Sequence, residues 1–186
     1  MIRSCAIALF SCVLVVSANT LSADVRADEK TQFQLAGVLG KVVNIFGGKA
    51  AREGVTSVVA VKGDRIVVTG EVSSSIVYRI LARGFDLQTG QMDWEVLSPY
   101  MNIEFARDIV LNDHALYIVG SRGDGAGNHF MVRALDAANG ALLWEDFSHL
   151  GFALGSTAVA AALGKNRLFV AGTADNQFVI RAYDIR

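Results

Sequence analysis

The chain has 186 residues, a formal net charge of −1 and 52% apolar residues, enough for one domain with a sizeable core. The near-neutral charge excludes both the basic excess typical of nucleic-acid-binding proteins and the acidic tract of a solvating tail. Eighteen glycines and one proline favour short strands joined by tight turns.

The N-terminal residues have the pattern of an export signal. Arg3 precedes the apolar run 6–16, which is too short to span a bilayer, since spanning needs about 20 apolar residues. Such a run is typical of a secretory signal peptide, and we expect residues 1–23 to be this signal. The candidate cleavage sites follow Ala18, Ala23 and Ala27. A retained membrane anchor is the alternative; otherwise the protein is periplasmic or secreted and does not associate with the membrane after cleavage.

Both cysteines, Cys5 and Cys12, lie inside this segment. A mature chain that lacks them has no disulfide, no thiolate metal ligand and no cysteine nucleophile. Lipidation of Cys12 is not expected, because the bulky Phe10 precedes it where a lipoprotein signal has a small residue.

Residues 24–53 form a separate N-terminal segment in which apolar residues recur at helical spacing. The recurring residues are Leu35, Val38, Leu39, Val42, Val43 and Phe46. They predict an amphipathic helix near residues 33–46 that ends at Gly47-Gly48. Its polar side carries only Lys41, too little basic charge for a helix on a lipid surface, so we expect it to cap a sheet edge or the core.

From residue 54 onward, three landmarks recur at an interval near 50 residues, which indicates an internal repeat. One is Asp-x-x-Thr/Asn-Gly followed by Trp-Glu, over residues 86–95 and 136–145. Another is a β-rich run that ends in glycine, over residues 65–70, 115–120 and 167–172. The third is an arginine three residues before an aspartate, as in Arg83 and Asp86, Arg133 and Asp136, and Arg181 and Asp184.

A period near 50 fits a four-stranded β-propeller blade, which takes roughly 40–50 residues. We therefore predict an all-β fold, a partial propeller over residues 54–186 with about three blades. The blades are expected near residues 54–100, 101–150 and 151–186. In the second unit, strands are expected at 109–111, 116–120, 129–135 and 141–146, with a glycine-rich hairpin loop over 121–128. Shorter loops are expected at 73–75 and 174–176.

The repeated residues have a structural interpretation. The motif consists of Asp86, Gly90, Trp94, Asp136, Gly140, Trp144 and Asp184. The aspartates that open the turns can accept bonds from N–H groups two or three residues on, and the glycines supply the positive φ at the turn's end. We expect the tryptophans to pack between neighbouring blades and each repeated arginine to pair with an acid in the adjacent strand.

These motifs resemble a known family. Residues 133–145 are similar to the repeat of pyrroloquinoline-quinone-type propellers, whose usual form is A-L-D-x-x-T-G-x-x-x-W, and residues 83–95 are a looser copy. The resemblance covers roughly residues 54–186 and is closest to the non-enzymatic quinoprotein-like repeat proteins of bacteria. It implies the β-propeller fold of quinoprotein alcohol dehydrogenases. Fold likeness alone does not transfer function, and we expect a role in protein binding or scaffolding because the blades repeat without a cluster of reactive residues.

The sequence offers no cluster of reactive residues. The three histidines, His114, His129 and His149, share no metal-ligand spacing. The stretch 123–128 lacks the remaining oxygen ligands of a calcium loop. We therefore assign no catalytic, cofactor-binding or metal site, and we expect no cofactor.

Enzymes of the resembled family enclose their quinone in a ring of eight blades and clamp it between a tryptophan and a disulfide of adjacent cysteines. Three blades and a mature chain without cysteine do not supply that enclosure, so we expect no quinone binding. The alternative is a remnant or subunit of a quinone-dependent periplasmic dehydrogenase.

The third unit is shorter than the others, because Ile185 and Arg186 alone follow Asp184. Without a turn glycine and a Trp strand, its sheet edge stays open and invites pairing with another chain. Three units also fall short of the 4–8 blades that typically close a propeller. Either the N-terminal segment covers this edge, or the protein joins a second copy or another protein there.

Overall fold

The computed structural model describes residues 52–53, 58–74, 77–99, 103–124, 127–148, 150 and 155–186. Within these ranges the chain forms twelve strands and no helix, so the all-β fold class is confirmed. The expected signal peptide and amphipathic helix lie outside the described residues. In the described ranges, no helix is long and apolar enough to cross a membrane.

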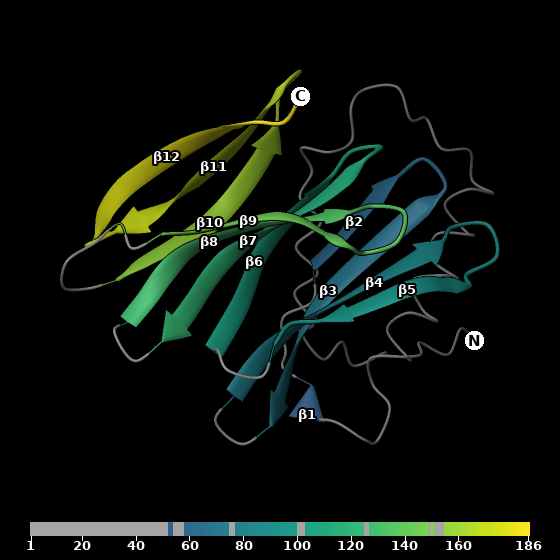
Figure 1. Ribbon diagram of the computed structural model, residues 1–186, viewed down its shortest axis with the longest axis horizontal. Helices are drawn as coiled ribbons and strands as arrows, with labels where there is room; N and C mark the ends of the chain where they lie inside the picture. The colour runs from purple at the N-terminus through teal and green to yellow at the C-terminus, as the bar shows by residue number, and fades with distance from the viewer. Residues whose placement is uncertain are drawn as a thin grey trace, which may run out of the picture.

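The strands form three antiparallel sheets in chain order (Figure 1). The first sheet contains β1 (Arg52–Glu53), β2 (Val58–Lys62), β3 (Arg65–Ser74), β4 (Val77–Asp86) and β5 (Met92–Leu97). The second contains β6 (Ile103–Leu111), β7 (Ala115–Asp124), β8 (Gly127–Asp136) and β9 (Leu142–Ser148), and the third β10 (Ser156–Leu163), β11 (Arg167–Ala174) and β12 (Gln177–Asp184). From β2 onward, neighbours in each sheet are neighbours in sequence; β1 pairs with β3 beyond the end of β2.

The second strand of each repeat is apolar on both sides. In β3, the consecutive residues Ile66, Val67 and Val68 are all buried, although alternate side chains of a strand point to opposite faces. Residues 116–119 of β7 are buried in the same way. Such runs occur where a strand is covered on both faces, and their β-branched residues also favour extended backbone.

The hairpins between the second and third strands are equally short in all three sheets. Ser74 pairs with Val77, Asp124 with Gly127, and Ala174 with Gln177, so two residues form each loop. The expected longer loop over residues 121–128 is therefore wrong, because β7 and β8 continue their ladder to the tip. In the third sheet, the loop residues Asp175 and Asn176 have φ of 46° and 63°, as a type I′ hairpin requires.

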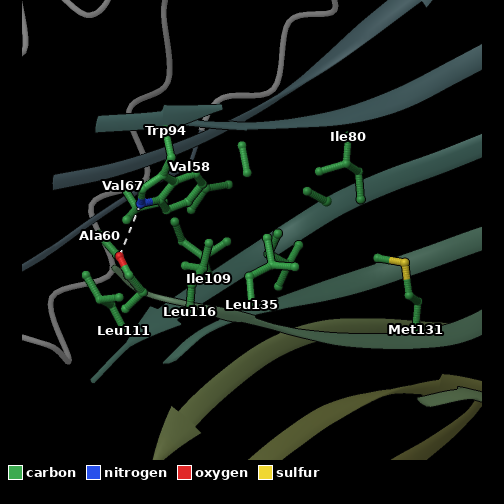
Figure 2. Close-up of a cluster of buried hydrophobic side chains, with 14 residues drawn as sticks. Val58, Ala60, Val67, Ile80, Trp94, Ile109, Leu111, Leu116, Met131 and Leu135 are labelled. Carbon is green, nitrogen blue, oxygen red and sulfur yellow. Dashed lines mark hydrogen bonds between the residues drawn. The ribbon is translucent and has the colours of Figure 1, made fainter. Parts of the chain in front are cut away.

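The second sheet lies between the other two (Figure 1). Its strand β6 packs across β2, β3 and β4 of the first sheet, and β10 of the third sheet packs across β6, β7 and β8. The core between the first two sheets runs from Trp94 at one end to Met131 at the other (Figure 2). A second cluster, which includes Phe130 and Leu168, fills the space between the second and third sheets.

The three sheets stack in the same orientation. Leu116 and Ile118 of β7 face the first sheet, and the matching residues of β11, Leu168 and Val170, face the second sheet. Each sheet therefore uses one face to cover its predecessor. Its opposite face is available to be covered by its successor.

Candidate functional site

The repeated aspartates organise their turns through hydrogen bonds to the backbone. Asp86 Oδ1 accepts the N–H of Thr89 at 2.6 Å, and Asp136 Oδ1 accepts the N–H of Ala138 at 2.7 Å. These are the bonds expected from the turn sequence. The bonds from Thr89 hold the pKa of Asp86 below its ordinary value. The glycines that end the two turns, Gly90 and Gly140, have φ of 71° and 75°.

Each repeated tryptophan lies between its own sheet and the next. The indole Nε1–H of Trp94 donates to the carbonyl of Ala137 in the second sheet at 3.2 Å. The Trp144 ring stacks on Tyr183 of the third sheet, with centroids 5.6 Å apart. Asp184, the third aspartate of the motif, pairs with Arg186 at the surface, which lowers the pKa of Asp184 to about 2.

Two of the three repeated arginines pair with the adjacent strand. Arg83 Nε lies 2.6 Å from Glu95, and Arg133 Nε lies 2.7 Å from Glu145. Arg181 differs, since its Nη1 lies 2.7 Å from Asp146 of the second sheet. The reason is topological: among the described strands, β12 has no fourth strand beside it to supply an acid.

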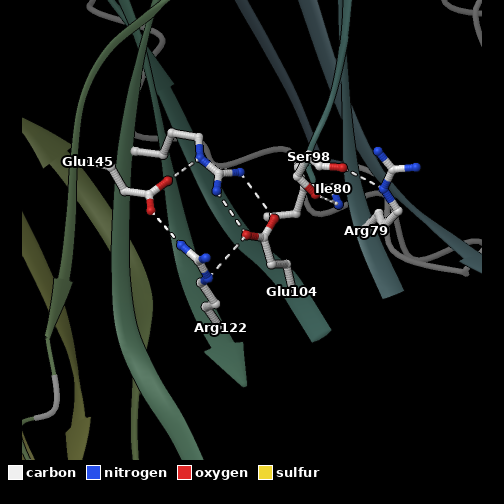
Figure 3. Close-up of polar contacts among 7 residues, drawn as sticks. Arg79, Ile80, Ser98, Glu104, Arg122 and Glu145 are labelled. Carbon is white, nitrogen blue, oxygen red and sulfur yellow. Dashed lines mark hydrogen bonds and ion pairs between the residues drawn. The ribbon is translucent and has the colours of Figure 1, made fainter. Parts of the chain in front are cut away.

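A buried ion-pair network occupies the face of the second sheet that is turned toward the first (Figure 3). Glu104 is fully buried and binds Arg133 Nη2 at 2.9 Å, while Arg122 Nη1 binds Glu145 at 2.8 Å. Two carboxylates and two guanidinium groups thus neutralise one another. Burial acts to lower the pKa of Arg133, but the bonds and charges of Glu104 and Glu145 raise it overall.

Sequence reasoning missed Glu104 and Arg122. Glu104 precedes the expected first strand, and a bulge between Ala106 and Asp108 interrupts the alternation that would have extended that strand backward. Neither residue belongs to the repeated arginine motif. The only sequence signal was one charged residue on each of two strands, Glu104 before the apolar part of β6 and Arg122 after that of β7. Recognising them as a pair required the register of the two strands, which places them opposite each other.

The two histidines among the described residues lie at opposite ends of β7. His114 is exposed in the turn between β6 and β7. His129 is buried, with Nε2 3.0 Å from Asp124 Oδ1 and its ring 4.5 Å from that of Phe147. His149 lies outside the described residues. In the described ranges, no group of three or more His, Cys, Asp and Glu residues could hold a metal ion.

An open pocket of about 280 Å³ lies where the turns of the first and second sheets meet. It is lined by Lys62, Gly63, Asp64, Arg65, Asp86, Asp93, Leu111, Asn112 and Asp113. Small-molecule sites are usually larger, about 300–1,000 Å³, and mostly apolar. Leu111 is the one large apolar residue in this lining, so the pocket lacks the apolar wall of such a site.

The feature that distinguishes the third sheet is its open side. In the first two sheets, β4 and β8 pair with the fourth strands β5 and β9. Among the described residues, β12 pairs with β11 alone. Unpaired N–H and C=O groups along a strand are a template for another strand. We call the unpaired side of β12 the β12 edge, and it is the candidate functional site.

Comparison with models of known protein families finds no match to this chain, and comparison with curated proteins finds none either.

Proposed function

We propose that the chain is an exported, non-catalytic β-propeller repeat module that acts in protein binding or scaffolding, and that it takes up a partner's strand at the β12 edge. The observation that carries this proposal is the difference between β12 and its counterparts. Each of β4 and β8 has a fourth strand beside it, whereas β12 has none within the described residues.

The propeller interpretation is supported by the way the sheets stack. Each is a meander, and each covers the preceding sheet with the same face. Neighbouring blades of a propeller are arranged in this way around a central channel. The described residues form three sheets, and a closed ring has 4–8 blades.

The chemistry of the incoming strand follows from the first two sheets. There the fourth strand places a Trp-Glu pair beside β4 or β8, with Glu95 opposite Arg83 and Glu145 opposite Arg133. The corresponding residue in β12 is Arg181, which is partly exposed. A strand with an acid at this position gains a charge-assisted bond in addition to its ladder.

A peptide that copies the chain's own fourth strand tests this proposal. Residues 140–148, labelled with a fluorophore, are titrated with the chain lacking residues 1–23, and anisotropy is recorded. We expect saturable binding at micromolar concentration. A peptide with lysine in place of the Glu145 residue should bind at least fivefold more weakly, and a scrambled peptide should not bind. Equal binding of all three peptides, or none, contradicts strand addition at this edge.

The proposal also includes the absence of quinone chemistry. The motif residues that resemble the quinone-binding family occupy turns and inter-sheet contacts, as Asp136 and Trp144 do. Titration with pyrroloquinoline quinone and calcium should therefore show no saturable binding. Micromolar binding, with dye reduction when an alcohol is added, would establish the dehydrogenase alternative instead.

A further inference from the structure

The outward face of the third sheet repeats the apolar pattern of faces that are covered elsewhere in the molecule. On this face, cross-strand pairs join Phe169 to Ala182, Ala171 to Ile180, and Thr173 to Phe178. The corresponding pairs of the second sheet are Tyr117 with Ala134, Val119 with Val132, and Ser121 with Phe130. The two faces therefore have nearly the same chemistry, row by row.

The two faces differ in how much of their side-chain surface is exposed to solvent. Tyr117, Phe130 and Val132 are buried beneath the third sheet. In contrast, Phe169 is 43% exposed, Phe178 72% and Ile180 62%. We call the surface formed by Phe169, Ala171, Thr173, Phe178, Ile180 and Ala182 the third-sheet face.

The third-sheet face has the size and composition of an interaction surface. Eight-residue strands are about 26 Å long, and three strands are about 14 Å across, so the face covers several hundred square ångströms. Its charged residues, Arg167 and Asp184, are cross-strand neighbours at one end of the face. The largest apolar patch of a typical monomer is of this extent and is often functional.

The stacking of the sheets shows what kind of surface covers such a face. The face is covered by another antiparallel sheet, whose small residues allow close approach: Ala106 on β6 and Ala158 on β10 are both fully buried in these contacts. A second copy of this chain can supply a sheet in two ways. It can offer the face of its first sheet that is turned away from the second sheet, which we call the remote face. Alternatively, it can offer its own third-sheet face.

The two ways differ in the exposure of the surface that is offered. On the first sheet's remote face, Ile66, Val68 and Phe85 have at most 2% of their surface exposed, whereas Phe178 and Ile180 of the third-sheet face are 72% and 62% exposed. The third-sheet face of a second copy is available. We propose that two copies associate through their third-sheet faces, which pack against each other about a two-fold axis with Phe169, Phe178 and Ile180 at the centre.

A two-fold contact of this kind is self-complementary and closes at a dimer. Two sheets that pack face to face lie about 10 Å apart and interleave their inner side chains. The contact goes beyond the proposed function, because it uses a face of the third sheet rather than the β12 edge. The two surfaces can therefore be tested separately.

Sedimentation velocity on the chain lacking residues 1–23, over a hundredfold range of concentration, measures the association. We expect a dimer that dissociates on dilution. Ile180→Lys should weaken it at least tenfold, and so should Ile180→Ser. Leu142→Lys is the matched control, since Leu142 is 60% exposed on β9 and should leave the dimer intact. A monomer at every concentration, or equal weakening by Leu142→Lys, overturns the proposal.

Cross-linking separates face-to-face packing from pairing of two β12 edges. The chain without its first 23 residues has no cysteine, so Phe169→Cys introduces a unique thiol on β11, one strand in from the edge. A bis-maleimide that spans about 10 Å, the separation of packed sheets, should link two copies in high yield. Edge pairing places these thiols three strand spacings apart, about 14 Å, and predicts no link, which would overturn the proposal.

The peptide and dimer experiments have independent outcomes. If the chain is monomeric but binds the fourth-strand peptide, the face-to-face dimer is wrong and the β12 edge proposal stands. If the dimer forms and the peptide does not bind, the reverse holds. Circular dichroism of each variant confirms that the β-sheet signal is retained.

Discussion

The indole Nε1–H of Trp94 donates a hydrogen bond to the main-chain carbonyl of Ala137, 3.2 Å away, and so joins the first sheet to the second. The same ring lies against Gly140, at the end of the turn that Ala137 helps to form. The two repeated landmarks, the Asp-Gly turn and the tryptophan, are therefore parts of one contact. The turn of the second unit receives the tryptophan of the first.

Replacing Trp94 with alanine should strongly destabilise the protein. The side chain is buried in the core between two sheets, and removal of a buried tryptophan costs about 3–5 kcal/mol. Urea denaturation of the chain without residues 1–23 measures the change. Trp144 is the matched control, because it is only partly buried, and Trp144→Ala should cost less. Equal losses of stability in the two variants would contradict the stabilising role that we assign to the contact between Trp94 and Ala137.

Gly140 should tolerate no side chain. Its φ is 75°, and a Cβ there would lie 2.7 Å from the Trp94 ring. Gly63 also has a positive φ, but nothing lies within 4 Å of its Cβ position. Gly63→Ala should therefore cost about 1–2 kcal/mol, the price of left-handed backbone, whereas Gly140→Ala should cost more. Measured in the Trp94→Ala background, the additional cost of Gly140→Ala should be smaller, which would identify the ring contact as part of the cause. The Val96 side chain, 2.8 Å from the same Cβ position, remains in that background.

The sequence predicted the period, the strand-rich units and the turn chemistry, because each depends on residues close together in the chain. Asp86 and Gly90 are an example, since both lie in the turn between β4 and β5 and each finds its hydrogen-bond partner within that turn. The long hairpin expected over residues 121–128 was wrong because glycines in a ladder resemble glycines in a loop. Gly123 is the example, since it lies in the ladder with Asn128 of β8 and Ile103 of β6 as its cross-strand partners.

Contacts between units could not be predicted in the same way. Arg181 was expected to pair with an adjacent strand, and it reaches Asp146 of another sheet. The Tyr183 hydroxyl donates to the same carboxylate at 2.7 Å, and burial, followed by this bond, raises the pKa of Tyr183. Such pairs depend on how two sheets stack, which is not encoded in the spacing of residues within one repeat.

The buried network should be sensitive to loss of a single charge. Glu104→Gln preserves the side-chain volume but removes the charge that faces Arg133 and Arg122. Breaking a buried ion pair from one side costs about 3–5 kcal/mol, which we expect to see in chemical denaturation.

The control for this prediction is Glu95→Gln. Glu95 pairs with Arg83 but its side chain is substantially exposed, and exposed pairs contribute about 0–1 kcal/mol. If Glu104→Gln costs no more than Glu95→Gln, the network does not stabilise the second sheet, to which all of its members belong.

Glu71 should make the protein less stable at neutral pH than at mildly acidic pH. The residue is buried, and its Oε1 has no hydrogen-bond partner among the described residues. Burial raises the pKa of Glu71 above its ordinary value of 4.5, although the charge of Arg107 opposes this shift. A carboxyl whose pKa is raised in the folded state contributes its stability fully below pH 4.5, and that contribution is lost as the pH rises through the folded pKa.

Glu71→Gln removes this ionisation while nearly preserving the side-chain volume. Relative to the unmodified chain, the variant should be more stable at pH 7, and the difference should shrink as the pH approaches 4.

Asp86→Asn is the control with the opposite sign, because bonds from Thr89 lower the pKa of Asp86. Its stabilising contribution is present above pH 3.8 and is lost as the pH falls, so Asp86→Asn should be less stable at pH 7, with a difference that narrows toward pH 3. Urea denaturation at pH 3, 4, 5.5 and 7 distinguishes the two profiles. A Glu71→Gln difference that does not change with pH would show that the buried carboxyl does not titrate in this range.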